Sequence, residues 1–319
     1  MNKPNQTIKT PVVFFIFNRP VITAKTFDII RKQRPSELFI VADGPREGNS
    51  EDILKCSEVR NIVEKINWPC MVQRNYSNIN LGLKKRISSG LDWVFSNVDR
   101  AIILEDDVAP SDSFFHFCEV LLEDFKNDRK IVSITGNNFQ DGLIRNHGSY
   151  YFSKYSHVWG WATWKRAWDL YEEDIQFWPE WSSSEEWKIH TPDKVERKFW
   201  DKIFSDVAIG KINSTWDYSW TASIWRQGGL TITPNVNLVK NIGFGKDASH
   251  TKNIKSKYSN METQKLSRII HMNEEVTQNI VADKYTFDNH YGGAKLRFPI
   301  VILFHIYKFS LSFIRKYYK

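Results

Sequence analysis

A chain of 319 residues is long enough for one large α/β domain or two small ones with a substantial core. Its 25% charged and 41% hydrophobic residues are ordinary for a soluble globular protein. The net charge of +7 indicates an anionic partner, for which a nucleotide, an acidic lipid or a nucleic acid qualifies. The 13 Trp, 12 Tyr and 21 Phe exceed ordinary usage, and aromatic faces serve as platforms for sugars as well as core fillers.

The cysteine content and the apolar stretches of the sequence also indicate the cellular compartment. Cys56, Cys70 and Cys118 are scattered, with neither metal-ligand spacing nor a disulfide framework, which favours a reducing cytoplasm. The first ten residues lack the apolar core of a signal peptide. No uncharged apolar stretch reaches the length that spans a bilayer. We therefore expect a cytoplasmic protein.

Apolar runs alternate with helical patterns through the first third of the chain. The runs predict strands over 11–17, 38–42, 71–74 and 101–104, and the patterns predict helices over 21–30, 50–66 and 80–95. This βαβαβαβ rhythm predicts a mostly parallel sheet with helices on both faces.

The fourth of these strands ends in three consecutive carboxylates, Glu105, Asp106 and Asp107. Acids at the carboxyl end of such a strand face the crevice where open α/β sheets bind ligands. Adjacent carboxylates repel one another, so a cation or hydrogen-bond donors must compensate them. A Mg²⁺-type ion that also holds a diphosphate suits this cluster. The alternative is a solvated acidic turn before a helix.

The other predicted strands also end in polar residues, Arg19 and Asp43, which should converge with the acids in one crevice. Neither a dinucleotide-binding nor a P-loop glycine motif accompanies them. Phosphates would therefore be held through a metal and basic side chains. Residues 84–86, Lys-Lys-Arg, could supply that charge, although a solvated basic helix face is the alternative.

The middle of the chain is dominated by aromatic residues. A helix over 114–125 and a strand over 131–136 precede an aromatic cluster at 150–171. Trp159 and Trp161 flank a glycine in a turn, which favours a sugar-facing wall. Trp164 and Trp168 lie four residues apart, as on the inner face of a helix.

Asp217 lies among rings at the start of an aromatic helix that extends to Gln227. Partial desolvation would raise its pKa and make it a better proton acceptor, whereas the alternative is an N-cap. A strand over 231–239 and a glycine-rich closing loop over 241–250 follow. Residues 251–290 show little periodicity, and we assign them no element.

The C-terminal tail carries no acidic residue after Asn289 and interleaves basic with apolar residues over 300–317. This pattern predicts a basic amphipathic helix on an anionic membrane surface. A helix packed on the main domain or on a dimer partner is the alternative. Nucleic acid is not an expected partner, because the basic residues concentrate in this tail rather than in a recognisable motif.

Five stretches in order resemble a GT-A fold glycosyltransferase, and more narrowly the N-acetylglucosaminyltransferase I family. These are the Asn-Arg-Pro turn at 18–20, the acids with the following Phe-Phe at 104–115, the Trp-flanked Asp at 216–220, and segments 233–239 and 244–250. Two departures stand out: Tyr218 replaces the family's second Asp, and Thr233 replaces an Arg.

The resemblance implies a role for each matching donor-side residue. Asp107 would coordinate Mn²⁺ or Mg²⁺, and Glu105 and Asp106 would hold the ribose and neighbouring parts of the nucleotide. Arg19 and Asp43 would contact the uracil. Two further residues would help bind the nucleotide-sugar, Arg86 near the base and His250 in the loop that closes over the donor.

On the acceptor side, the resemblance implies that Asp217 deprotonates the acceptor hydroxyl in a single inverting displacement. It implies a GT-A (Rossmann-like) domain over 1–290, with a nucleotide-sugar half at 1–136 and an acceptor half at 137–290, followed by a basic amphipathic segment at 291–319. The expected activity is metal-dependent transfer of a hexose from a UDP-sugar, UDP-N-acetylglucosamine being the suggested donor, to a glycan or lipid-linked acceptor in bacterial surface-polysaccharide synthesis at the inner membrane face.

Two other functions remain open at this point. A nucleotidyltransferase also sets acids on an α/β sheet, but it would need a glycine-rich basic loop near the N-terminus. A non-catalytic carbohydrate-binding or membrane-scaffold protein would keep the aromatic residues without needing the acids.

Overall fold

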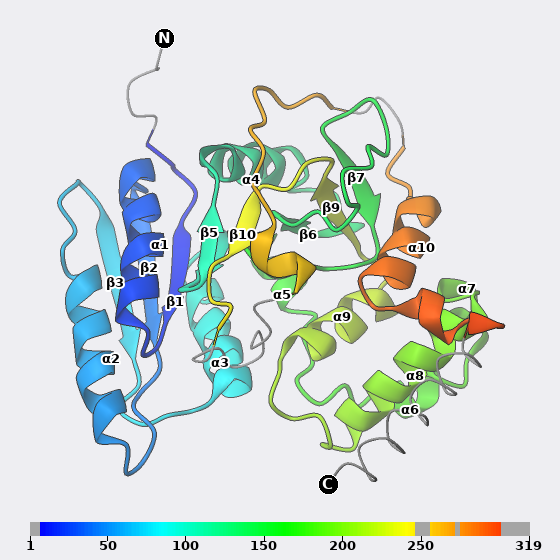
Figure 1. The fold of residues 1–319 in the computed structure, drawn as a ribbon, viewed down its shortest axis with the longest axis horizontal. Helices are drawn as coiled ribbons and strands as arrows, with labels where there is room; N and C mark the ends of the chain where they lie inside the picture. The colour runs from blue at the N-terminus through cyan, green and yellow to red at the C-terminus, as the bar shows by residue number, and fades with distance from the viewer. Residues whose placement is uncertain (1–6, 246–255, 272–274, 301–319) are drawn as a thin grey trace, which may run out of the picture.

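The computed structural model describes residues 7–245, 256–271 and 275–300, and a mixed eight-stranded sheet organises them (Figure 1). The strand order is β3-β2-β1-β4-β8-β6-β9-β7, and a small second sheet pairs β10 with β5. The strands are β1 (Val12–Ile16), β2 (Glu37–Ala42), β3 (Met71–Tyr76), β4 (Arg100–Glu105), β5 (Val108–Pro110), β6 (Ile131–Thr135), β7 (Tyr150–Ser153), β8 (Trp161–Trp164), β9 (Leu230–Pro234) and β10 (Val239–Asn241).

Strands β1 to β4 pair in parallel, as do β6 and β9, whereas β8 runs antiparallel to both β4 and β6, and β7 antiparallel to β9. The α-helices are α1 (Pro20–Gln33), α2 (Ser50–Val63), α3 (Leu83–Phe95), α4 (Asp112–Asp124), α5 (Lys165–Trp168), α6 (Trp178–Trp181), α7 (Glu185–His190), α8 (Lys194–Ala208), α9 (Asp217–Arg226) and α10 (Ile280–Asn289), with 3₁₀ turns η1 (Lys257–Asn260) and η2 (Gly293–Leu296).

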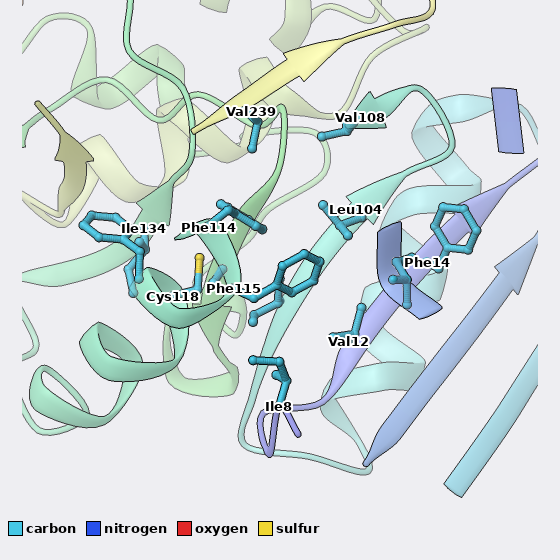
Figure 2. Close-up of a cluster of buried hydrophobic side chains, with 14 of the residues drawn as sticks. Ile8, Val12, Phe14, Leu104, Val108, Phe114, Phe115, Cys118, Ile134 and Val239 are labelled. Atoms are coloured by element: carbon cyan, nitrogen blue, oxygen red, sulfur yellow. The ribbon is translucent and has the colours of Figure 1, made fainter. Parts of the chain in front are cut away.

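Alternating side chains of each strand enter two different cores, because successive residues of a strand point to opposite faces of the sheet. Val12 and Phe14 of β1 share a core with side chains of α1, α2 and α4. Figure 2 shows the side of this core that α4 covers with Phe114 and Phe115. Val13 and Phe15 pack with α3 and with the aromatic helices α5 to α9. Burial on both faces explains why β1 and β4 are continuous apolar runs in the sequence.

The predicted mostly parallel sheet with flanking helices is confirmed, and the first half follows the predicted order of elements. The carboxyl ends of the parallel strands meet at one edge, since Phe15 lies opposite Glu105 and Ile16 opposite Ala42. Arg19, Asp43 and the acids after β4 therefore gather at this edge.

The second half differs from the sequence prediction in several places. The aromatic cluster at 150–171 forms strands β7 and β8, and Trp164 ends a strand rather than lining a helix. The single strand predicted over 231–239 is two strands, β9 and β10, in different sheets. Helix α10 lies in a stretch to which we assigned no element.

The described start of the C-terminal segment, 291–300, packs on the domain. Arg297 forms ion pairs with Asp193, the N-cap of α8, and with Asp288 of α10. Phe298 and Ile300 stay 78% and 47% exposed. The predicted amphipathic helix over 300–317 lies outside the described residues except for its first residue. No helix in the described part of the chain is long and apolar enough to cross a membrane.

Candidate nucleotide-sugar site

Three consecutive carboxylates lie between the end of β4 and the start of β5: Glu105 ends the strand, and Asp106 and Asp107 form the turn. Asp106 is 3% exposed, and the Asp107 side chain is 14% exposed. Burial, followed by the charges of Asp107 and Asp106, raises the pKa of the Glu105 carboxyl well above its usual range. Burial likewise raises the pKa of Asp106, although Arg19 opposes that shift. The turn therefore holds more buried negative charge than its protein surroundings neutralise.

Arg19 is the cation that the structure places against this cluster. It follows β1 and is the N-cap residue of α1, whose first residue is Pro20. Its Nη2 forms an ion pair with Asp106 and lies 3.1 Å from Asp107 Oδ2. The predicted uracil contact of Arg19 stays a prediction, since in this structure its guanidinium is committed to the acids.

Asp43 anchors a loop. Its carboxylate accepts hydrogen bonds from the backbone N–H groups of Gly44, Leu81 and Gly82 at 2.8, 2.9 and 3.1 Å, and from Asn80 Nδ2 at 3.1 Å. These four donors fill the sites at which a carboxylate can accept. A contact between Asp43 and uracil, which the resemblance implies, would require the release of one of these bonds.

Arg86 and Arg60 hold the segments that follow β2 and β3 through hydrogen bonds to their oxygens. Arg86 is 7% exposed and donates to the carbonyl and side-chain oxygens of Asn75 at 3.2 and 2.8 Å. Arg60, from α2, donates to the carbonyls of Asp43 and Ser77 at 3.2 and 2.6 Å. The sequence gives no signal for Arg60, because a basic residue in the last turn of a helix is ordinary and the carbonyls that it reaches belong to other segments.

Asp217, from the second half of the chain, follows Trp216, which stacks on Trp161 opposite Ile103 of β4. Its carboxylate accepts from the Thr215 hydroxyl and, at 3.1 Å, from the Tyr218 N–H. Its charge acts on Glu105, because it is one of the causes, after burial and the two neighbouring Asp charges, that raise the Glu105 pKa. The N-cap of α9 is Trp216, so the alternative of an N-cap Asp does not hold.

The two tryptophans predicted as a sugar wall have different environments. Trp161 is 1% exposed and stacks on Trp216 with ring centroids 5.4 Å apart. The prediction that Trp161 faces a sugar is wrong, because its position in β8 turns the indole into the core. Trp159, one residue before Gly160, is half-buried, and its ring lies edge-on to that of Phe244 with the two centroids 6.0 Å apart.

The beginning of the predicted closing loop covers the acids. Strand β10 pairs with β5, and the Ile242 N–H donates to the Asp107 carbonyl at 2.7 Å. A Cβ on Gly243 would lie 2.4 Å from Asp107 Oδ2, so only glycine permits this close approach. Residues 246–250, including His250, lie outside the described residues.

The donor atoms present fit one kind of metal site. No three His, Cys, Asp or Glu side chains within the described ranges are arranged to hold a metal ion. An ion of the Mg²⁺ or Mn²⁺ type that bridges a diphosphate requires only one or two protein carboxylates. Asp107 supplies one such carboxylate, whose side chain is 14% exposed, beside the buried Asp106. The residues therefore fit a metal that phosphate oxygens help to hold.

No protein-family model and no curated protein matches this chain. It is similar to a UDP-glucose pyrophosphorylase complexed with UDP-glucose, at 12% identity over 71% of this chain and 90% of the other, with a TM-score of 0.35. It is also similar to mannosyltransferase PcManGT from Pyrobaculum calidifontis in complex with GDP-Man and Mn²⁺, at 12% identity over 70% and 77%, with a TM-score of 0.37. Likenesses this distant assign no activity, substrate or metal.

Proposed function

We propose that the protein is a metal-dependent, inverting glycosyltransferase that moves a sugar from a UDP-sugar, UDP-N-acetylglucosamine being the first candidate, to a glycan or lipid-linked acceptor of bacterial surface polysaccharide. The observation that carries the proposal is the position of Asp217 near the acids that end β4: Trp216, the residue before it, stacks on Trp161, and Trp161 lies opposite Ile103 of β4. An inverting displacement needs one base beside the reacting centre and no covalent nucleophile. Asp217 would supply that base beside the proposed metal–diphosphate position.

On the donor side, Asp107 would hold the metal. A divalent ion there supplies charge stabilisation to the departing nucleoside diphosphate. Arg19 and Arg86 provide fixed positive charge at the same edge of the sheet. Asp43 contributes by holding the loop at 80–82 beside the base position.

On the acceptor side, Asp217 would take the proton from the acceptor hydroxyl as its oxygen bonds to the anomeric carbon. The bond between that carbon and the diphosphate oxygen breaks in the same step. The Thr215 hydroxyl and the Tyr218 N–H donate to this carboxylate and orient it. Trp159 and Phe244, in contact beside Gly243, are candidates for the wall of the sugar position.

We extend the proposal to the location of the enzyme, on the cytoplasmic face of the membrane. Support comes from the acid-free sequence after Asn289 and from the exposed side chains of Phe298 and Ile300 that lead into it. The protein should float with vesicles that contain phosphatidylglycerol and not with neutral vesicles. Replacing Lys308, Arg315, Lys316 and Lys319 with glutamine should abolish flotation.

The test of the donor is calorimetric titration of UDP, GDP, CDP and dTDP, each with and without Mn²⁺. We expect UDP alone to bind, with binding lost on chelation of the metal and in Asp107→Ala. Binding of another nucleotide instead would discard the UDP-sugar. Absence of metal-dependent binding by all four would favour the non-catalytic carbohydrate-binding protein.

A further inference from the structure

Arg19 is bound to the carboxylate that the proposed function gives to the metal. Its Nη2 pairs with Asp106 Oδ1 and lies 3.1 Å from Asp107 Oδ2, while its Nε donates to Asp106 Oδ2 at 3.4 Å. Only 19% of the Arg19 side chain and 14% of the Asp107 side chain are exposed. One guanidinium therefore bridges two acids in a largely enclosed position.

The segment after β10 closes the other side of this pair. A Cβ on Gly243 would lie 2.4 Å from the same Asp107 oxygen and 2.9 Å from Arg19 Nη1. The Ile242 N–H fixes the backbone of this segment to the Asp107 carbonyl at 2.7 Å. Asp107 Oδ2 is thus enclosed between Arg19 and the backbone of Gly243.

Arg19 and a divalent cation cannot both occupy Asp107 Oδ2 at full strength. The oxygen would have to accept from the guanidinium and ligate the ion at once, and the two positive groups would repel each other. A bound diphosphate would remove this competition. Its oxygens can accept bidentate hydrogen bonds from the Arg19 guanidinium in place of Asp107 Oδ2, which is then available to the ion. The diphosphate also supplies the remaining ligands of the ion.

We propose that Arg19 is the internal counter-ion of the acid cluster and competes with the divalent cation for Asp107, so that the metal enters with the donor diphosphate rather than before it. This inference rests on the proposed function, since it assumes a metal–diphosphate site at Asp107. Metal and nucleotide must then each strengthen the binding of the other, because coupling between two ligands is reciprocal.

The test measures the affinity of the protein for Mn²⁺ from the electron paramagnetic resonance signal of the free ion, with and without UDP. Wild-type protein should bind Mn²⁺ weakly alone and on the order of tenfold more tightly with saturating UDP. Arg19→Ala should bind Mn²⁺ alone roughly tenfold more tightly than wild type and lose most of the gain from UDP. Arg100→Ala removes the same charge from the pair with Glu123 at the opposite end of β4 and should match wild type.

Two results separate the inference from the function. If both proteins bind UDP with Mn²⁺ but Arg19→Ala binds Mn²⁺ alone no more tightly than wild type, the counter-ion role is overturned and the proposed site stands. If wild type binds no UDP at any Mn²⁺ concentration, both the counter-ion role and the proposed site are overturned.

Should Arg19→Ala fail to fold, Arg19→Lys provides the same test, because one ammonium group cannot bridge two carboxylates as the guanidinium does. It should also bind Mn²⁺ more tightly than wild type, and equal affinity would contradict the proposal.

Discussion

Two sets of carboxylates lie at the same edge of the sheet in opposite states. Asp43 is surrounded by four N–H donors that fill its acceptor sites. Asp106 and Asp107 share the Arg19 guanidinium, and Glu105 lies beside them. Burial raises the pKa of Asp43, Glu105 and Asp106 alike. The hydrogen bonds to Asp43 oppose that rise, whereas the neighbouring acids add to it at Glu105 and Asp106. Both sets follow parallel strands, and both were predicted to bind the donor.

This difference in hydrogen bonding and charge separates a carboxylate that stabilises the protein from carboxylates that are available to bind a ligand. A carboxylate whose partners come from its own chain stabilises that chain and has little left to offer a substrate. A cluster left with excess charge destabilises the free protein and gains when a cation arrives. We therefore propose that Asp43 belongs to the scaffold and that Glu105, Asp106 and Asp107 take part in the chemistry.

Asp217 gives the largest expected effect. If it belongs with the reacting groups, Asp217→Asn should lower transfer by about 100- to 10,000-fold, the usual contribution of a general base. The affinity for UDP with Mn²⁺, measured by calorimetry, should be unchanged. Asp169→Asn, in an exposed i,i+4 pair with Lys165, is the matched control and should transfer normally. Retained transfer in Asp217→Asn would remove it from the reacting groups.

Asp43→Asn probes the other side of the comparison. The new amide would direct donors at backbone N–H groups that need an acceptor, so the free energy of unfolding in urea should fall by about 1–3 kcal/mol. Asp28→Asn, in an exposed pair with Arg31, should change it by no more than about 0.5 kcal/mol. Normal stability together with lost UDP binding would instead make Asp43 a reader of the base.

Glu105→Gln should have a smaller effect of opposite sign. It keeps the shape of the side chain and is neutral without binding a proton. Because the pKa of Glu105 is raised to about 8 in the folded protein, wild type loses stability as the pH rises from the ordinary carboxyl range toward 8. At pH 7 the metal-free Glu105→Gln protein should therefore gain about 1 kcal/mol of unfolding free energy. Thermal unfolding in the presence of chelator measures this gain. A loss of stability would mean that the Glu105 carboxylate, like Asp43, is compensated by its surroundings in the free protein. The proposed difference between Asp43 and Glu105 would then be wrong.

The sequence predicts the first half of the fold well because each strand there is buried on both faces. Continuous apolar runs such as Val12–Ile16 are then distinct from the amphipathic helices between them. The second half resists prediction because its strands are aromatic and antiparallel. Trp164 and Trp168 have helical spacing, yet one ends β8 and the other ends α5.

The sequence predicts which residues gather at the site only to the extent that it predicts where the strands end. The sequence places Arg19, Asp43 and the acids at one edge, since each closely follows a parallel strand. It does not indicate that loop 80–82 saturates Asp43 or that Arg19 turns to Asp107, because those hydrogen bonds join segments far apart in the chain. The burial of Trp161 depends in the same way on a distant partner, Trp216.

The most direct test of the central claim is to follow a UDP-sugar by phosphorus nuclear magnetic resonance in the presence of diamagnetic Mg²⁺ and candidate acceptor glycans. A glycosyltransferase releases UDP, and we predict that UDP accumulates with wild type and not with Asp217→Asn. A nucleotidyltransferase given pyrophosphate would instead form UTP and a sugar 1-phosphate. Formation of UTP, undiminished in Asp217→Asn, would contradict the account.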